Sequence, residues 1–314
     1  MTPIQNPSVT VVVPSYNRGH ILALTLPTYL QPEVGELILV DDCSTDNTPD
    51  VVHELMTTYP RIRYMRNEVN IKQTGSKNRG IAEAKFPYVF FGDDDSVLRP
   101  GSISYLLQTI QEYQADIVGA RALYMTLKDQ WVHMEDFVRD RYRPNIKQIV
   151  DLSRMAIDFS FSYKEPVEVP VTHACFMVRR TVASQILFDL NYKGNAYREE
   201  TDFVVRASLA GYKVMYDSRA VQVNLPPCMV RGGGAHSGTA KWWYESAVQN
   251  NDYFLSKNYA AMQAKWDLPY SIEQMREFFQ QELKAKKKAE CWRKWLKRIG
   301  IYYPLRYVKR LFVR

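Results

Sequence analysis

The stretch VTVVVPSY, residues 9–16, sets the fold class, because a run of β-branched residues is followed at once by polar side chains. Three further runs of this kind are ELILVDD (36–42), IRYMRN (62–67) and YVFFGDDD (88–95). Between the runs lie ILALTLPTYL, DNTPDVVHELMTTY and TGSKNRGIAEAK, which have the composition and spacing of helices. Alternating strands and helices predict an α/β protein with a Rossmann-like, mostly parallel central sheet flanked by helices.

Polar side chains end each predicted strand. They are Ser15, Tyr16 and Asn17, then Asp41 and Asp42, then Asp93, Asp94 and Asp95. In an open sheet of this kind ligands bind beyond the carboxyl ends of the strands, so we expect these groups to gather on one rim. Neither GxGxxG nor GxxxxGK[ST] is present, so the sequence supports neither a usual dinucleotide fold nor a P-loop.

The stretch FFGDDDSV (90–97) places three aspartates at the end of an apolar run. Two like charges about 4 Å apart repel by roughly 4 kcal/mol at an effective dielectric near 20, so the three carboxylates are costly if left alone. Oxygen ligands at a strand end suit Mg²⁺ or Mn²⁺ bound to a substrate diphosphate, and a solvated, inert cluster is the alternative. If the strand continues, Asp93 and Asp95 point to one face and Asp94 to the other.

Composition indicates a soluble globular protein of 314 residues. The cysteines show no CxxC pairing, which argues against a zinc site or a disulfide scaffold and suits a reducing cytoplasm. We expect neither an export signal nor a membrane span, because the chain lacks a long apolar run. The net charge of +7 is unevenly distributed: residues 284–314 hold twelve Lys or Arg and one acid, a local charge of +11, which leaves −4 for residues 1–283.

Five motifs resemble, in order and spacing, those of the family 2 glycosyltransferases that have the GT-A fold, of the type that builds bacterial cell-surface glycans. They are PSYNR (14–18), LVDDCSTDNT (39–48), NIKQTGSKNRGIAEA (70–84), GDDDSVLRPGSI (92–103) and YREETDFVVRASLAGY (197–212). The resemblance implies a catalytic domain over residues 1–260, with a nucleotide-binding half over about 1–120 and an acceptor-binding half over about 121–260. A helical, basic, amphipathic extension then occupies 261–314.

The resemblance implies roles in donor binding for the first two motifs. Pro14, Tyr16 and Arg18 belong to the nucleotide-binding motif, with Tyr16 against the base. The alternative is that Tyr16 is an ordinary strand-end aromatic. Asp42 should accept a hydrogen bond from the base, and Asp94 should reach the ribose. An acceptor facing a base N–H favours uracil or thymine, so we expect a UDP-sugar donor first and a dTDP-sugar next.

The resemblance also implies a metal ion, Mn²⁺ or Mg²⁺, bound to the donor diphosphate by Asp95 with help from Asp93. Two lysines depart from the family pattern NxGxxxARNxG: Lys72 stands at its Gly and Lys77 at its Arg. Both lysines keep or add positive charge near the donor, where they would hold phosphate or base, or they are solvated surface lysines.

The fifth motif opens with EETDF, residues 199–203. In the family the acidic pair carries the general base, usually at the second position, here Glu200, with Glu199 as the other candidate. A carboxylate there would take the proton of an acceptor hydroxyl during direct, inverting displacement, with no covalent enzyme intermediate. The alternative is that acids at a helix start are simply favoured by the helix dipole.

The last part of the catalytic domain offers further candidates. The family often has a histidine in VxHxxxP, where this chain has Asn224; His236 appears later, in RGGGAHSG, as a third metal ligand or as a loop histidine without a role. Trp242 and Trp243 could bind the acceptor by stacking on a sugar or a lipid tail, or they pack a helix on the sheet. A loop that closes over the donor is also expected here.

The basic tail, residues 284–314, carries Trp292, Trp295, Leu296 and Ile299 at helical spacing among its Lys and Arg. This pattern describes a segment lying in the plane of an anionic membrane surface, and its apolar stripe argues against nucleic acid as the partner. Plain docking of a helix on the body is the third interpretation. We therefore predict a cytoplasmic protein, peripherally associated with the inner face of the cell membrane.

These interpretations lead to a metal-dependent, inverting glycosyltransferase that acts on a hydroxyl of a lipid-linked or cell-surface glycan. One alternative is a sugar-nucleotide nucleotidyltransferase, but a GxGTR-like loop after the first strand is missing. The other is a non-catalytic, membrane-associated nucleotide-sugar-binding protein. Asp95 together with Glu200 speaks against that reading, and hydrolysis of the donor by the purified protein would discriminate.

Overall fold

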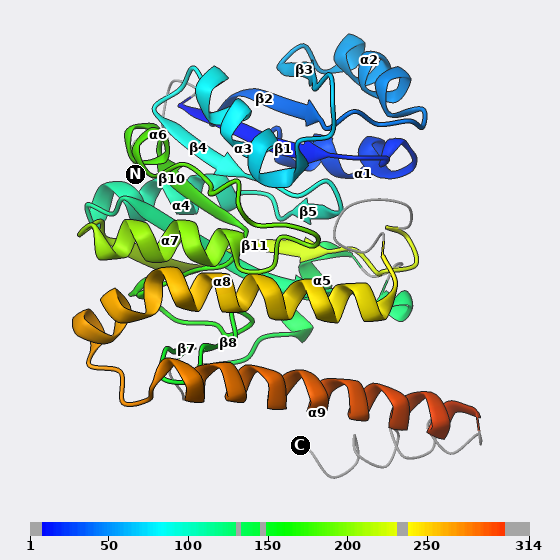
Figure 1. The fold of residues 1–314 in the computed structure, drawn as a ribbon. Helices are drawn as coiled ribbons and strands as arrows, with labels where there is room; N and C mark the ends of the chain where they lie inside the picture. The colour runs from blue at the N-terminus through cyan, green and yellow to red at the C-terminus, as the bar shows by residue number, and fades with distance from the viewer. Residues whose placement is uncertain (1–7, 130–132, 145–148, 231–237, 299–314) are drawn as a thin grey trace. The chain divides into compact units, whose positions relative to one another are not determined.

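The computed structural model describes residues 8–129, 133–144, 149–230 and 238–298 (Figure 1). The chain divides into two compact units, Met1–Pro269 and Tyr270–Arg314. The first unit contains a large, mixed sheet with helices on both faces, and the described part of the second is a long helix. The predicted α/β class, with helices at the C-terminal end, is confirmed.

The N-terminal part of the first unit alternates strictly between strands and helices. Its elements are β1 (Val9–Ser15), α1 (Gly19–Tyr29), β2 (Val34–Asp41), α2 (Thr48–Thr58), β3 (Ile62–Arg66), α3 (Lys72–Glu83) and β4 (Tyr88–Phe91). β1 pairs in parallel with both β2 and β4, and β2 pairs in parallel with β3. The parallel arrangement predicted from the alternating sequence is therefore confirmed.

The remaining part of this unit completes the sheet with mixed strand directions. Its elements are β5 (Ser96–Leu98), α4 (Ser102–Glu112), β6 (Ile117–Tyr124), the 3₁₀ turn η1 (Leu127–Asp129), α5 (Met134–Asp140), β7 (Val150–Asp151), β8 (Ala156–Ile157), β9 (Val167–Glu168), β10 (Phe176–Arg179), α6 (Arg180–Ile186), α7 (Glu199–Leu209), β11 (Val214–Asn224) and α8 (Ala240–Trp266). The strand order is β3-β2-β1-β4-β10-β6-β11-β5. β10 runs antiparallel between β4 and β6, whereas β11 is parallel to β6.

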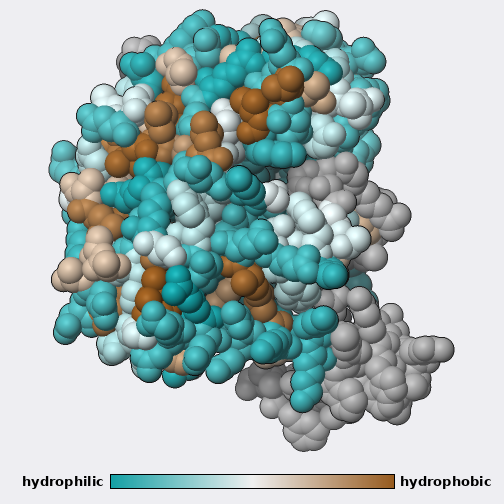
Figure 2. Space-filling view, in the orientation of Figure 1, coloured by the Kyte–Doolittle hydropathy of each residue, from teal (hydrophilic) through white to brown (hydrophobic). Residues whose placement is uncertain are grey.

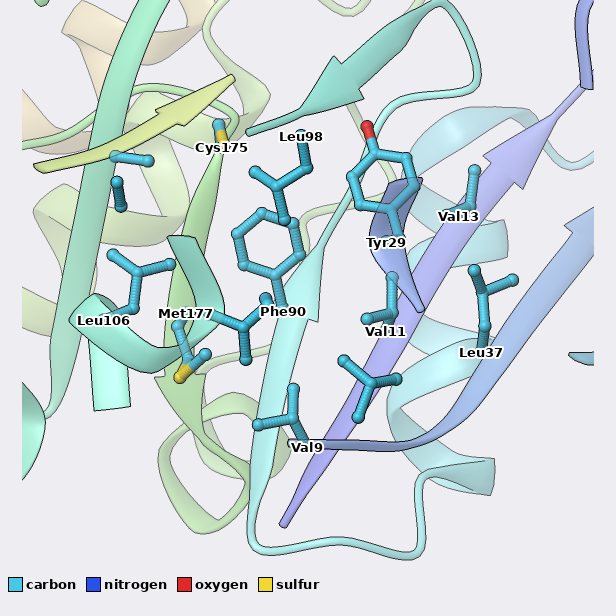
Figure 3. Close-up of a cluster of buried hydrophobic side chains, with 14 of the residues drawn as sticks. Val9, Val11, Val13, Tyr29, Leu37, Phe90, Leu98, Leu106, Cys175 and Met177 are labelled. Carbon is cyan, nitrogen blue, oxygen red and sulfur yellow. The ribbon is translucent and has the colours of Figure 1, made fainter. Parts of the chain in front are cut away.

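Both faces of β1 are covered, which explains its continuous apolar run. Val11 and Val13 belong to a fully buried cluster with side chains of α1 and α4 (Figure 3). On the opposite face, a Cβ on Gly80 of α3 would lie 2.3 Å from Val12 Cγ1, so only glycine allows this approach. Figure 2 shows the surface in the orientation of Figure 1. Most side chains on this face are hydrophilic, and apolar residues occur in small separate areas.

Tyr29 connects this core to the loop that follows β4. Its ring is fully buried in the cluster of Figure 3. Its hydroxyl donates to the Asp93 carbonyl over 2.9 Å and accepts from the Asp93 amide over 3.2 Å. A Cβ on Gly92 would lie only 2.9 Å from the Tyr29 ring, so glycine is required for this close approach. The core therefore holds the backbone at the start of the acidic run.

The second unit contains α9 (Ile272–Arg298). Ser271 and Gln274 form a reciprocal capping box at its start, because the Ser271 amide donates to Gln274 Oε1 and the Gln274 amide donates to Ser271 Oγ. Trp292 and Trp295 belong to α9, but the described side chains end at Lys288, and residues 299–314 lie outside the described part. Within that part, none of the helices combines the length and the apolar character that crossing a membrane requires.

Candidate active site

A cavity of about 1090 Å³ lies beyond the carboxyl ends of β1, β2 and β4. The predicted site residues that line it are Pro14, Tyr16, Arg18, Asp42, Lys72, Asp93, Asp94, Asp95, Glu200, Trp242 and Trp243. Lys77 and Glu199 are buried and do not line it. His236 lies outside the described residues. The sequence motifs therefore converge on one cavity, from both parts of the sheet.

Asp93, Asp94 and Asp95, here called the aspartate turn, lead through a turn into β5. β4 already ends at Phe91, so the alternation of side chains that a continued strand would impose does not apply. All three carboxyl groups border the same cavity. The Leu225 amide donates to the Asp95 carbonyl over 3.0 Å, so the chain beyond β11 also holds the turn in place.

Arg18 forms ion pairs with two carboxyl groups of this turn. It lies just before α1 and is 1% exposed. Its Nε donates to Asp94 Oδ1 over 3.2 Å, its Nη2 lies 3.7 Å from Asp95 Oδ2, and its Nη1 donates to the Val230 carbonyl over 2.7 Å. Ser15 Oγ donates to the other oxygen of Asp94. The Asp94 carboxyl is thus held between two neighbours, and Asp95 remains the more exposed, at 25% against 13%.

Asp93 is the least compensated carboxyl of the turn. Gln222 Nε2 donates to its Oδ2 over 2.8 Å. Burial, followed by the charge of Asp95, raises the pKa of Asp93 to about 7, against the opposing charge of Lys77. Among the described residues, Arg18 is the cation that forms ion pairs with the turn, so one guanidinium lies beside three carboxyl groups.

The carboxyl groups of the aspartate turn are candidate ligands for a divalent cation. No group of three or more His, Cys, Asp or Glu surrounds a common point within the described ranges. Mg²⁺ and Mn²⁺, however, are commonly held by one or two carboxylates together with substrate phosphates and waters. Asp95 and Asp93 offer oxygen donors on the cavity wall, so the donor set fits such an ion.

Asp42 accepts hydrogen bonds from the backbone at the start of α3, including the amide of Lys72. Asp42 Oδ1 accepts from the Ile71 amide over 2.7 Å and from Asn67 Nδ2 over 2.9 Å, and its Oδ2 accepts from the Lys72 amide over 2.9 Å. Lys72 takes the left-handed conformation, with φ of 65°, which glycine adopts without strain. The geometry explains why glycine suits this position, and the exposed Lys72 side chain lies on the cavity wall.

Glu199 and Glu200, here called the glutamate pair, begin α7. Lys77 Nζ lies 2.8 Å from Glu199 Oε1 and 2.7 Å from Glu200 Oε1, and Gln73 Nε2 also donates to both oxygens. Lys77 was expected to add charge near the donor, and its ammonium is directed to this pair. Only Glu200, at 17% exposure, reaches the cavity, since Glu199 is fully buried.

The two carboxyls of the pair differ in their electrostatics. Burial and the charge of Glu200 raise the pKa of Glu199 well above its usual value, against Lys77. Burial acts in the same direction on Glu200, but the charge of Lys77 and hydrogen bonds outweigh it, and the pKa of Glu200 is lowered. Glu200 is therefore suited to remain ionised and to accept a proton.

The lining of the cavity also contains side chains that the sequence analysis missed, among them Tyr124, Arg143, Thr172, His173 and Tyr197. The Cys175 amide donates to His173 Nδ1, so Nε2 carries the hydrogen that is donated to the Ala120 carbonyl over 2.7 Å. Burial lowers the pKa of His173. Arg143, Thr172 and His173 lie in irregular segments, where no periodic pattern marks them. Tyr124 ends β6, and Tyr197 opens the fifth motif, whose interpretation rested on its acidic pair.

The two tryptophans lie in the first turn of α8. Thr239 Oγ1 accepts from the Trp242 amide over 3.1 Å, which fixes the start of the helix. The Trp243 ring contacts the Tyr197 ring edge-on, with centroids 6.0 Å apart, and Asn195 Nδ2 donates to the Trp243 carbonyl. Both tryptophans border the cavity, and Trp243 also packs against the loop before α7.

Residues 10–187, more than half of the chain, match the family model described as Glycosyl transferase family 2. The chain belongs to this family. Two relatives of this family 2 glycosyltransferase are each 36% identical to it. They are a GalNAc(5)-diNAcBac-PP-undecaprenol beta-1,3-glucosyltransferase of Campylobacter jejuni, over 117 residues, and the glycosyltransferase GlyG of Streptococcus pneumoniae, over 112 residues. The matches span 36% and 35% of this chain, and only 38% and 37% of those two proteins.

Solved structures share the fold of this family 2 glycosyltransferase. Staphylococcus aureus TarS 1–349 in complex with UDP-GlcNAc has a TM-score of 0.57 at 17% identity, over 80% of this chain and 67% of that one. GalNAc-T7 with UDP, GalNAc and Mn²⁺ has a TM-score of 0.56 at 15% identity, over 87% and 54%. The predicted GT-A fold is confirmed.

Proposed function

We propose that this family 2 glycosyltransferase is a metal-dependent, inverting hexosyltransferase that acts on a hydroxyl of a lipid-linked or cell-surface glycan. The observation that carries the proposal is that the aspartate turn and Glu200 line one cavity from different parts of the sheet. A donor bound along the first and an acceptor beside the second would meet inside it.

On the donor side, Tyr16 lies against the base, Asp42 accepts a hydrogen bond from it, and Asp94 reaches the ribose. A UDP-sugar is the favoured donor and a dTDP-sugar the next. The UDP-GlcNAc and UDP in the titles of the TarS and GalNAc-T7 structures support this choice, as does the Mn²⁺ in the second. Asp95 and Asp93 would hold Mn²⁺ or Mg²⁺, which when bound stabilises the charge on the departing diphosphate.

On the acceptor side, Glu200 takes the proton of the attacking hydroxyl. The hydroxyl oxygen forms a bond to the anomeric carbon as the bond from that carbon to the diphosphate breaks, so attack from the opposite face inverts the centre. Lys72 pairs with the diphosphate, and Trp242 and Trp243 contact the acceptor. Exclusion of water by the cavity walls strengthens these interactions.

The acceptor class rests on the relatives and on the basic tail. The name of the Campylobacter relative specifies an undecaprenol-linked glycan. Near an anionic leaflet each Lys or Arg contributes about 1 kcal/mol, so residues 284–314 should hold the enzyme at the inner face of the cell membrane. Deletion of 284–314 should release the protein from anionic vesicles in co-sedimentation, while UDP binding persists. Equal pelleting of both forms would contradict the membrane placement.

The proposed function is tested with the full chain and a panel of sugar nucleotides, with and without Mn²⁺. We expect metal-dependent release of UDP from a UDP-sugar, and a thermal shift with UDP. A ligand at a hundredfold excess over its dissociation constant stabilises by about 2.7 kcal/mol. Preference for a guanine nucleotide would contradict the proposed uridine donor. If the protein turns over none of the sugar nucleotides, the proposed enzymatic activity is wrong.

A further inference from the structure

Lys77 lies between two carboxyl groups and can balance the charge of only one. Its side chain is 1% exposed, and its ammonium lies 2.8 Å from Glu199 and 2.7 Å from Glu200. Gln73 adds a neutral donor to the same two oxygens and no further charge. Two ionised carboxylates here would leave one negative charge buried and uncompensated, which is strongly unfavourable.

We propose that Glu199 carries a proton in the folded protein and that Lys77 and Glu199 are positioning residues, which hold Glu200 as the single ionised carboxylate facing the cavity. This inference rests on the proposed function in one respect, the role of Glu200 as the base. The protonation of Glu199 itself stands on the geometry of the pair.

The surroundings of Glu199 favour its neutral form. The residue is fully buried, and its Oε2 has no hydrogen-bond partner among the described residues. Burying an ionised carboxylate with one oxygen unpaired is far less favourable than burying a neutral carboxyl group in the same place. Glu200 differs because its side chain reaches the cavity and is partly solvated. The proton therefore belongs on Glu199.

Other charged or titratable groups around the pair do not change this assignment. Asp93 after β4, His173 before β10 and Tyr124 at the end of β6 interact electrostatically with Glu200. Asp93 adds negative charge, and burial lowers the pKa of His173, which favours its neutral form. The first turn of α7 favours negative charge, a preference that Glu200 satisfies.

The arrangement also fixes the direction of the base. Glu200 Oε1 accepts from both Lys77 and Gln73, so the carboxylate cannot rotate without losing a charge-assisted hydrogen bond. Lys77 and Glu199 stay behind it and do not line the cavity. They act through Glu200, and neither is a catalytic residue.

The first test measures proton binding without reference to activity. Glu199→Gln mimics a neutral carboxyl group, and Glu54→Gln, at an exposed position on α2, is the matched control. Glu199 with a raised pKa contributes stability that is complete below the unfolded-state pKa of about 4.3 and is lost as the pH rises. The unfolding constant of Glu199→Gln, divided by that of the wild type, should therefore fall about tenfold for each pH unit above 5.

This ratio is measured by urea denaturation between pH 5 and 8. The control curve should run parallel to the wild type. If Glu199→Gln also runs parallel, Glu199 is ionised in the folded protein and the inference is overturned.

The second test follows the pH dependence of turnover. Lys77→Met removes the charge that keeps Glu200 ionised, so the acidic limb of the profile should move up by at least one pH unit, and Lys77→Arg should restore it in part. Lys85→Met, at an exposed site after α3, is the control for losing a lysine. An unchanged limb in Lys77→Met overturns the positioning role. If Lys77→Met does not fold, the position of the limb in Lys77→Arg and the urea experiment decide.

The two tests separate this inference from the proposed function. Full activity of Glu200→Gln would remove Glu200 as the base, and the urea experiment would still report the proton on Glu199. Conversely, parallel urea curves would reject the proton on Glu199 and leave Glu200 as the base.

Discussion

The aspartate turn and the glutamate pair are two carboxyl clusters beside the same cavity, but their access to it differs. Among the described residues, Arg18 forms ion pairs with Asp94 and Asp95 of the turn, and Lys77 forms ion pairs with both carboxyls of the pair. The cation of each cluster is buried, and each cluster contains a carboxyl whose pKa is raised by burial, Asp93 or Glu199.

The difference lies in access to the cavity. All three residues of the aspartate turn line it, so an ion that enters with the donor can reach them. In the glutamate pair only Glu200 lines it, and Glu199 is fully buried, where such an ion does not reach it. Accessibility therefore separates a cluster suited to a divalent cation from one suited to a proton.

The largest effect is expected from Glu200→Gln, which keeps the shape of the side chain and removes the base. Turnover should fall by about 10² to 10⁴, while the affinity for UDP changes little, because the proposed donor contacts do not include Glu200. Steady-state kinetics and calorimetric titration of UDP measure the two effects. Undiminished turnover would show that the base is elsewhere.

Exchanging Arg18 or Lys77 for methionine should reveal whether a divalent metal ion can replace the lost positive charge. Removing one partner of a buried ion pair costs about 3–5 kcal/mol, so both Arg18→Met and Lys77→Met should be less stable. Mn²⁺ should restore part of the stability of Arg18→Met, since the aspartate turn is open to it, and none of that of Lys77→Met. Urea unfolding with and without Mn²⁺ measures this, and equal restoration in both variants would contradict the distinction.

Lys72→Gly should have two smaller effects: it should raise the stability of the protein and weaken UDP binding. Glycine relieves the left-handed strain, so the protein should gain up to about 1 kcal/mol of stability. The loss of the charge should weaken UDP binding several-fold if Lys72 pairs with the diphosphate. Lys72→Ala is the control, because it keeps the strain and loses the charge. Thermal unfolding and calorimetry give both values; unchanged affinity would make Lys72 a surface lysine.

The N-terminal part of the fold was predictable because its signals are local. Most strands there are apolar runs followed by polar residues, as in β1 and β4, and helices of regular length separate them. The aspartate turn was recognised as a site because three adjacent acids at the end of an apolar run have an obvious electrostatic cost. Glu200 was identified only through the family resemblance.

The second part was not predictable in the same way. β7, β8 and β9 contain two residues each, too few for an alternating pattern. The pairing of Lys77 with the glutamate pair joins residues more than 120 positions apart, so no local pattern could reveal it. Arg18 was assigned to the nucleotide, and its ion pair with Asp94 depends on how β4 turns into β5.

The central claim is that the aspartate turn binds the donor through a metal while Glu200 serves the acceptor in the same cavity. Calorimetric titration of UDP in Mn²⁺ and in EDTA, on wild type, Asp95→Asn and Glu200→Gln, tests it most directly. We predict metal-dependent binding of equal affinity in wild type and Glu200→Gln, and loss of the metal-dependent part in Asp95→Asn, with all three folded. Equal binding by Asp95→Asn and wild type would contradict the account.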